Sequence, residues 1–218
     1  MNLTTTEKYA LAMLEAHGRL TALQKQERAL YLAASCVWEM MQAKSVTPDK
    51  KGQLRVSAPL PETLSYCGPV YERMSKKPMK PAKVPYDRIW TNKRIKTLVE
   101  SIVDDLIGKS VLVVEQKSSL RKAKLCHVDT TVIAEDIAAV KQMDRTASPD
   151  QADLAVLLLE SGTAKKLLNK QELSALKRVV KQSNSDFRIY VKKVKKRFRD
   201  GKAVIWAGIG SAASSASH

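Results

Sequence analysis

Apolar residues between Asn92 and Ile107 recur at the spacing of one α-helical face, and this pattern constrains the fold more than any other feature. They stand at i, i+3, i+4, i+7, i+8, i+11 and i+12: Ile95, Leu98, Val99, Ile102, Val103, Leu106 and Ile107. Gly108 follows directly, and glycine commonly ends a helix. The segment therefore predicts a long amphipathic helix that buries one face against other elements.

Helical signals also lie on both sides of this segment. A capping pattern at Thr4–Glu7 opens a first helix, and Gly18 ends it. The run Leu154–Leu159 is apolar nearly all round, which predicts that the helix around Leu154–Leu168 is the most buried. We expect Gly201 to interrupt the last helical stretch. The remaining helices are expected at residues 25–43, 61–74, 130–142, 171–181, 185–199 and 203–213.

Short apolar runs beside turn residues predict strands at two places. Val46–Val56 indicates a hairpin, and Val111–Glu115 indicates a strand that turns at Ser118–Arg121 into another near Lys124–Val128. Three prolines and four lysines in Lys76–Pro85 predict an extended connector. The 218 residues contain only 8 Gly and 8 Pro, so few tight turns are needed.

The expected fold class is therefore mainly α. We predict a single globular helical domain over residues 1–218, with one or two small β-hairpins and a frayed tail at about 209–218.

No pattern of catalytic or metal-binding residues stands out. The chain has three histidines and three cysteines, without a C-x-x-C pair, a glycine-rich phosphate loop or an H-E-x-x-H motif. The neighbouring acids Asp104-Asp105 and Glu135-Asp136 do not face each other on a helix, so they are poor acid–base pairs. We predict a protein that is not an enzyme and needs no metal or cofactor.

The sequence also bears on location. Its first residues show no apolar signal core, and its longest clean apolar runs are too short to cross a bilayer. Cys36 and Cys126 stand among apolar neighbours, which favours free core thiols and a reducing compartment. These observations predict a soluble, cytoplasmic protein.

Charge gives the strongest functional signal. The chain has 38 Lys and Arg against 22 Asp and Glu, a formal net charge of +16. A positive field of this size attracts nucleic acid or anionic lipid, although a high isoelectric point can also serve solubility alone.

Basic residues gather in three places. One cluster lies in the connector, a second surrounds Trp90 at the start of the amphipathic helix, and a third spans Arg188–Lys202. The third cluster is also compatible with a core helix that has a solvated outer face. Because Lys and Arg bind phosphate and Trp favours the membrane interface, we predict a lipid or phosphate site in the first two. The predicted site residues are Lys76, Lys77, Arg88, Trp90, Lys93, Arg94 and Lys96.

Four places in the chain, taken together, resemble the Golgi phosphoprotein 3 family, in its bacterial type. They are Leu14–Leu20; Cys36–Met41 followed by Gly52-Gln53-Leu54; Ser75–Pro78 with Arg94–Leu106 and Ser110-Val111-Leu112; and Leu154–Leu159 with Ser161-Gly162 and Val204–Ala207. The resemblance spans most of the chain.

The resemblance implies a helical domain around a central four-helix bundle, binding to phosphatidylinositol 4-phosphate, and adaptor contacts with other proteins. The family's lipid pocket has two arginines one turn apart in the helix that matches Arg94–Leu106; Lys96 matches the first of them, while the next turn carries Val99. The family's second-helix arginine falls near Ala33, and its tryptophan falls near Leu23 or Gln24. The resemblance therefore supports the family's fold for this chain more strongly than it supports the family's lipid pocket.

The function predicted from the sequence is docking on the cytosolic membrane face through anionic phospholipid headgroups. The alternative is a nucleic-acid binder, because the helix that ends at Ile107 and the strands after it resemble part of a winged helix. A third possibility is a scaffold whose basic face is only solvated. An unidentified protein partner and a homo-oligomer both remain open.

Overall fold

The computed structural model describes residues 3–88, 91–116, 124–142, 148–182 and 185–214. Side chains are described for these residues except 88, 115, 116, 124–126 and 202–214. The described chain is mainly helical, with two separate two-stranded antiparallel sheets. This confirms the expected mainly α fold class with small hairpins.

The α-helices follow one another along the chain in this order: α1 (Thr5–His17), α2 (Gln26–Gln42), α3 (Gly68–Lys76), α4 (Val84–Arg88), α5 (Asn92–Gly108), α6 (Thr131–Lys141), α7 (Pro149–Glu160), α8 (Ala164–Leu167), α9 (Lys170–Gln182) and α10 (Asp186–Ser214). Three short 3₁₀ helices join them: η1 (Leu20–Ala22), η2 (Glu62–Cys67) and η3 (Pro81–Lys83). The strands are β1 (Val46–Pro48), β2 (Leu54–Val56), β3 (Leu112–Gln116) and β4 (Lys124–Val128).

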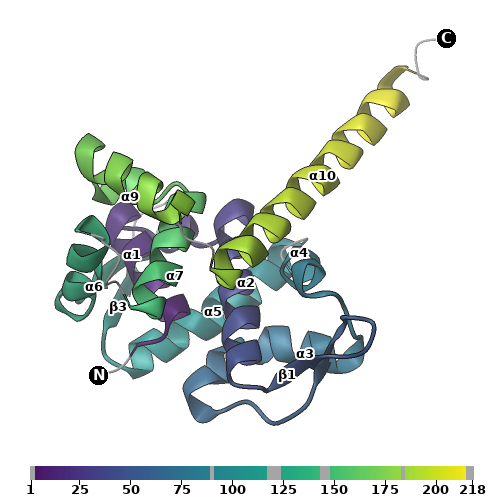
Figure 1. Ribbon diagram of the computed structural model, residues 1–218, viewed down its shortest axis with the longest axis horizontal. Coiled ribbons are helices and arrows are strands. Elements are labelled where there is room, and N and C mark those ends of the chain that lie inside the picture. Colours follow the sequence, from purple (N-terminus) through teal and green to yellow (C-terminus); the bar gives the residue numbers. More distant parts are fainter. Residues whose placement is uncertain (1–2, 89–90, 117–123, 143–147, 183–184, 215–218) are drawn as a thin grey trace.

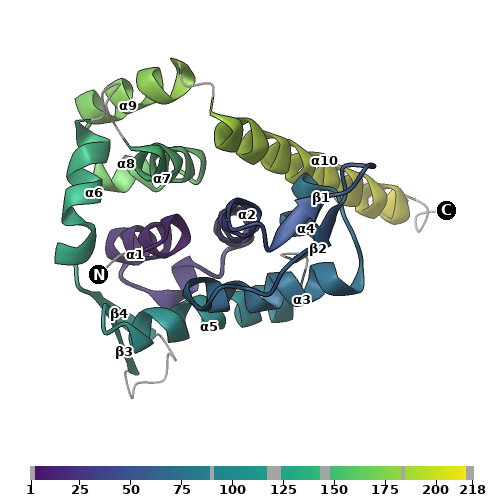
Figure 2. The same cartoon turned by 60° about the horizontal axis from the view of Figure 1, so that its bottom comes forward.

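Helices α1 and α2 lie at the centre of the molecule, and the other helices surround them (Figure 2). The start of α1 has the capping box expected from the sequence, with Thr4 and Glu7 bonding each other's backbone amides. Its end has the expected Gly18, at a φ of 63° that residues with a Cβ rarely adopt.

The longest unbroken run of buried residues is in α2, from Ala29 to Val37. The expectation that the helix around Leu154–Leu168 is the most buried is therefore wrong. Helix α7 buries Leu154–Leu158, but it ends at Glu160, where the chain turns through Gly162. Helix α7 packs on α1, α6, α9 and α10, but the residues at both of its ends are only partly buried or exposed.

The amphipathic helix and both strand pairs form where the sequence places them. Helix α5 buries Ile95, Leu98, Val99, Ile102, Val103 and Leu106 as its apolar stripe. In the first hairpin Val46 pairs with Val56, and in the second Leu112 pairs with Val128. The predicted turn at Ser118–Arg121 lies outside the described residues.

Two expectations for the region before α5 need correction. The helix expected at 61–74 is split into η2 and α3, which join at Gly68-Pro69. The connector is extended only in part, because Pro81 opens η3 and Pro85 lies in the first turn of α4. A proline fits these first-turn positions because the amide that it lacks has no partner inside the helix.

The last helix is also longer than expected. Gly201 does not interrupt it, and α10 runs without a break to Ser214, away from the rest of the molecule (Figure 1). A Cβ added at Gly201 would lie 2.5 Å from the Tyr86 hydroxyl oxygen. Glycine therefore allows α10 to approach α4 closely, which is a packing role inside a continuous helix.

Candidate functional site

Four of the predicted site residues are exposed lysines at two neighbouring helix ends. Lys76 and Lys77 lie at the end of α3, and Lys93 and Lys96 lie in the first turns of α5. We call these four lysines the basic face. Trp90 and the side chain of Arg88 lie outside the described part of the chain.

A carboxylate clamp holds these two helix ends together. The Arg73 side chain in α3 donates to Asp87 Oδ2 at 2.7 Å, and Arg94 Nη1 in α5 lies 3.6 Å from the same oxygen. Arg94 also donates to the Asp87 carbonyl at 2.9 Å. Burial tends to raise the pKa of Asp87, but the arginines outweigh it and the pKa is lowered. Arg94 is therefore engaged in joining α3, α4 and α5.

The lysines of the basic face have little that neutralises them. Lys96 Nζ lies 3.5 Å from Glu100, but both side chains are more than half exposed, and such pairs contribute little. No ion pair involving Lys76, Lys77 or Lys93 is found among the described residues. These charges remain available to an external anion.

The third basic cluster lies beside the connector because α10 packs on η3 and α4. The Tyr86 ring meets Phe198 edge-on at 6.5 Å, and the Tyr190 hydroxyl donates to the Pro81 carbonyl at 3.5 Å. Phe187, Tyr190, Val191, Val194 and Phe198 form the buried side of α10. The outer side of α10 is exposed to solvent. This agrees with the alternative interpretation of the third cluster, a core helix that has a solvated outer face.

A shallow hollow of about 630 Å³ lies between this outer side of α10 and the end of α7. Lys195 is fixed there by an ion pair with Glu160 at 2.7 Å. The other residues around the hollow are Lys192, Lys196, Arg199 and Asp200. The basic residues around the hollow give the outer side of α10 a local excess of positive charge.

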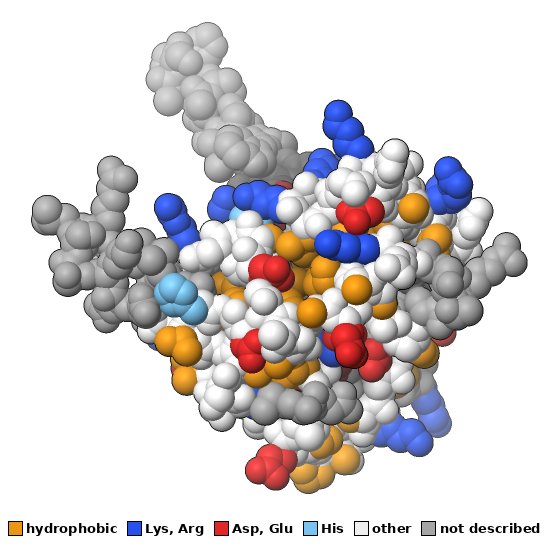
Figure 3. Space-filling view, turned by 90° about the vertical axis from the view of Figure 1, so that its left-hand side faces the viewer, with side chains coloured by type: hydrophobic (Ala, Val, Ile, Leu, Met, Phe, Trp, Pro, Cys, Tyr) orange, Lys and Arg blue, Asp and Glu red, His pale blue; other side chains and the backbone are white. Residues whose placement is uncertain are grey.

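Basic residues do not cover the molecule evenly. On the side that carries α6 and α9, acidic side chains lie near the middle with hydrophobic ones between them, and Lys and Arg lie mostly toward the edges (Figure 3).

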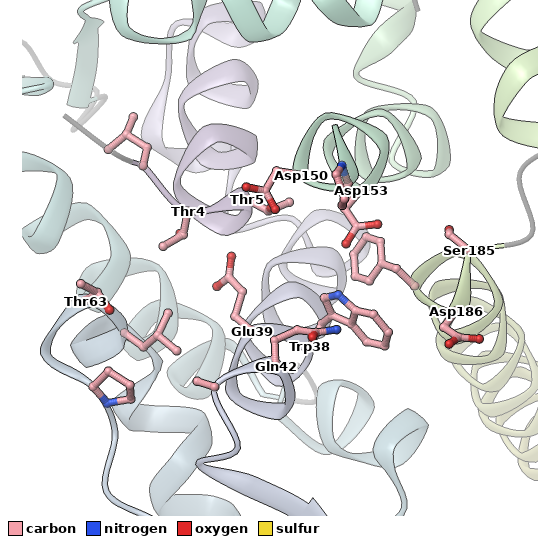
Figure 4. Close-up of a pocket in the computed structure, with 16 residues that line it drawn as sticks. Thr4, Thr5, Trp38, Glu39, Gln42, Thr63, Asp150, Asp153, Ser185 and Asp186 are labelled. Atoms are coloured by element: carbon pink, nitrogen blue, oxygen red, sulfur yellow. The ribbon is translucent and has the colours of Figure 1, made fainter. Parts of the chain in front are cut away.

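A hollow of about 740 Å³ is lined by acidic and aromatic side chains. Its walls come from the starts of α1, α7 and α10, the end of α2 and the beginning of η2 (Figure 4). Glu39, Asp150, Asp153 and Asp186 supply four carboxylates, and no Lys, Arg or His is among the described residues that line the hollow. We call this hollow the acidic pocket.

Glu39 is the one carboxylate of the acidic pocket that is fully engaged by donors. It accepts from the Thr6 amide at 2.8 Å, from the Thr6 hydroxyl at 2.7 Å and from the Tyr66 hydroxyl at 2.7 Å. Burial raises its pKa despite these bonds. Because the Thr6 amide belongs to the first turn of α1, Glu39 acts as an anionic cap for that helix.

Asp153 has a different environment. Burial raises its pKa to about 7, and the nearby charges of Asp150 and Glu39 add to this effect. A hydrogen bond from the Trp38 indole acts in the opposite direction, and the two side chains lie next to each other in Figure 4. None of Asp150, Asp153 and Asp186 has an ion-pair partner among the residues described.

A second buried carboxylate joins α1 to α5. The Glu7 side chain is fully buried, and Lys109 Nζ lies 2.5 Å from it and 2.9 Å from Asp105. Thr4 links this group to Glu39, because its hydroxyl lies 2.6 Å from the Tyr66 hydroxyl. The donors and acceptors match one another closely, which is typical of a structural network.

Sequence analysis did not predict the acidic pocket. Asp150 and Asp186 stand near helix starts, where acids are common, and this gave no reason to group them. Only the packing of α2, α7 and α10 brings their carboxylates to one hollow.

The described residues contain no group of three or more His, Cys, Asp or Glu side chains arranged to hold a metal ion. No described helix is both long enough and apolar enough to cross a membrane. A scan of known protein families finds none that matches this chain. A comparison with curated proteins likewise finds no relative.

Proposed function

We propose that this protein is a non-catalytic peripheral membrane protein that binds anionic phospholipid headgroups through the basic face. The observation that carries the proposal is the clamp at Asp87, which holds the lysine-bearing ends of α3 and α5 together. A fixed group of exposed lysines attracts a surface of phosphate groups more effectively than the same charges spread over the molecule.

Helix α10 adds further positive charge to the molecule. Lys192, Lys196 and Arg199 lie on its outer side, away from the side chains that pack on η3 and α4. The sequence of α10 then becomes uncharged, with Ala203-Val204-Ile205-Trp206 following Lys202. Helices that lie at a membrane interface combine Lys and Arg with apolar residues and Trp.

Duplex nucleic acid fits the same face less well. In a winged-helix protein, α5 would be the helix that contacts DNA. Its exposed side, however, carries the acids Glu100 and Asp104 after Lys93 and Lys96. Acids at these positions would repel the phosphate backbone along most of the helix.

The test compares two variants with the same loss of charge. In the first, Lys76, Lys77, Lys93 and Lys96 are replaced by Ala. In the control, the replaced residues are Lys165, Lys166, Lys170 and Lys177, which are exposed on α8 and α9 on another side of the molecule (Figure 2). Binding is measured by flotation with vesicles of phosphatidylcholine, with and without phosphatidylserine or a phosphoinositide.

Each lysine near an anionic bilayer contributes about 1 kcal/mol, so the first variant should bind at least about a hundredfold more weakly at low salt. The control should lose much less, and both should melt like the parent chain because exposed charges contribute little to folding. Equal losses in the two variants would show that only net charge matters. Tighter binding to duplex DNA than to the vesicles would favour the nucleic-acid alternative.

A further inference from the structure

The acidic pocket is unusual in a chain of this charge. A net charge of +16 means that most of the surface repels cations, yet one hollow is lined by three carboxylates that have no ion-pair partner among the described residues. Asp150 and Asp186 lie in the first turns of α7 and α10, where the helix dipole favours negative charge. Asp153 lies further along α7, where burial raises its pKa to about 7.

The aromatic side chains of the pocket suit an organic ligand. Trp38 and Phe187 line the pocket with Leu3 and Leu64, and the Trp38 ring is held in place by Phe187 at 5.3 Å and by Tyr190, behind it, at 5.9 Å. Aromatic faces attract cations and also pack against methylene groups. The volume of about 740 Å³ is within the usual range for small-molecule sites.

The placement of the carboxylates argues for more than one positive centre on the ligand. They come from α2, α7 and α10, and no three of them are grouped closely enough to hold a single metal ion. A flexible chain with several ammonium groups can meet separated carboxylates, while its methylene groups contact the aromatic rings.

We propose that the acidic pocket binds a linear polyamine, a ligand with two or more ammonium groups joined by short carbon chains. Asp150 and Asp153 bind one ammonium group, Asp186 binds another, and Trp38 packs against the methylene groups between them. Glu39 contributes negative charge to the hollow while it remains bonded to Thr6 and Tyr66. The site is independent of the basic face.

The experiment is calorimetric titration of the full chain with putrescine, spermidine and spermine, and with Mg²⁺ as a simple counter-ion. The tripeptide Lys-Lys-Lys forms a separate arm, which distinguishes a free polyamine from lysine side chains of a peptide. The pocket variant is Asp150→Asn with Asp153→Asn, and the matched control is Glu100→Gln with Asp104→Asn, two exposed acids on α5.

Affinity should increase with the number of ammonium groups and should fall at least tenfold in the pocket variant, with the control within about twofold of the parent. Equal weakening in both variants, tighter binding of Mg²⁺ than of spermidine, or no binding of any polyamine would overturn the proposal. Tighter binding of the tripeptide than of spermidine would overturn the choice of a free polyamine.

If the double variant does not fold, Asp153→Asn decides the question alone. Its binding is followed by Trp38 fluorescence in a chain whose other tryptophans, Trp90 and Trp206, are changed to Phe. A polyamine in the pocket should change the Trp38 emission in the parent background, with a weaker response in Asp153→Asn. An unchanged emission in the parent would refute the site.

Discussion

At the scale of single residues, Asp153 shows how one environment sets both charge and stability. Burial raises the pKa of its carboxyl to about 7, from about 3.8 for the unperturbed group. Between these values the folded protein holds a proton that the unfolded chain has released. Asp153 therefore favours folding at low pH, and this contribution is lost as the pH rises through about 7.

We expect Asp153→Asn to reduce the loss of stability between pH 5 and pH 8, because asparagine resembles the protonated carboxyl at every pH. At pH 8 the variant should be more stable than the parent chain. Urea unfolding midpoints at the two pH values measure the effect, with Asp104→Asn on the exposed side of α5 as the control. A fall of the same size in the parent and in Asp153→Asn would contradict this account.

At the scale of elements, the contact between α10 and α4 depends on the missing Cβ of Gly201. Gly201→Ala should gain helix propensity, about 1 kcal/mol, but the new methyl group must displace the Tyr86 ring. We expect the variant to be no more stable than the parent, whereas the same change should stabilise a Tyr86→Ala chain by about 0.5–1 kcal/mol. A thermodynamic cycle of the four proteins gives the coupling, and additive effects would exclude a packing role for Gly201.

Local patterns explain why most elements could be predicted. A few neighbouring residues are enough to predict each of these elements. Examples are the helical period of Ile95–Leu106, the helix cap at Ser148 with Pro149, and the two apolar strand runs. Boundaries that depend on distant contacts could not be predicted. In the sequence, Gly201 looks like a helix breaker, and only the structure shows that Tyr86 packs against it. Likewise, the sequence of α7 does not reveal which other helices cover it.

The candidate sites follow the same division. The basic clusters were visible as runs of Lys and Arg, but the sequence did not show that Asp87 engages Arg94 and leaves Lys93 free. The acidic pocket was not visible, because Glu39, Asp150 and Asp186 are far apart in the chain and converge only after packing.

At the scale of the whole molecule, the ion pair between Glu7 and Lys109 joins the beginning of the chain to its middle. Lys109→Met should cost about 2 kcal/mol or more, because it leaves the buried Glu7 carboxylate without its cation. A second change, Glu7→Gln, should restore most of this loss, since glutamine retains the capping bond to the Thr4 amide. Urea unfolding of the two single variants and the double variant measures the coupling. Losses that simply add would show that the pair does not act as a unit.

The cap of α1 has a consequence for the order in which the chain can fold during synthesis. Helix α1 receives its anionic cap from Glu39 and its linking hydroxyl from Tyr66, and its Glu7 carboxylate pairs with Lys109. These partners are 33, 62 and 102 positions downstream. Translation at about 5–20 residues per second delivers them seconds after α1 emerges. The start of α1 therefore reaches its final form only after Lys109 has left the exit tunnel, and a nascent-chain pause before Lys109 would leave the start of α1 without this partner.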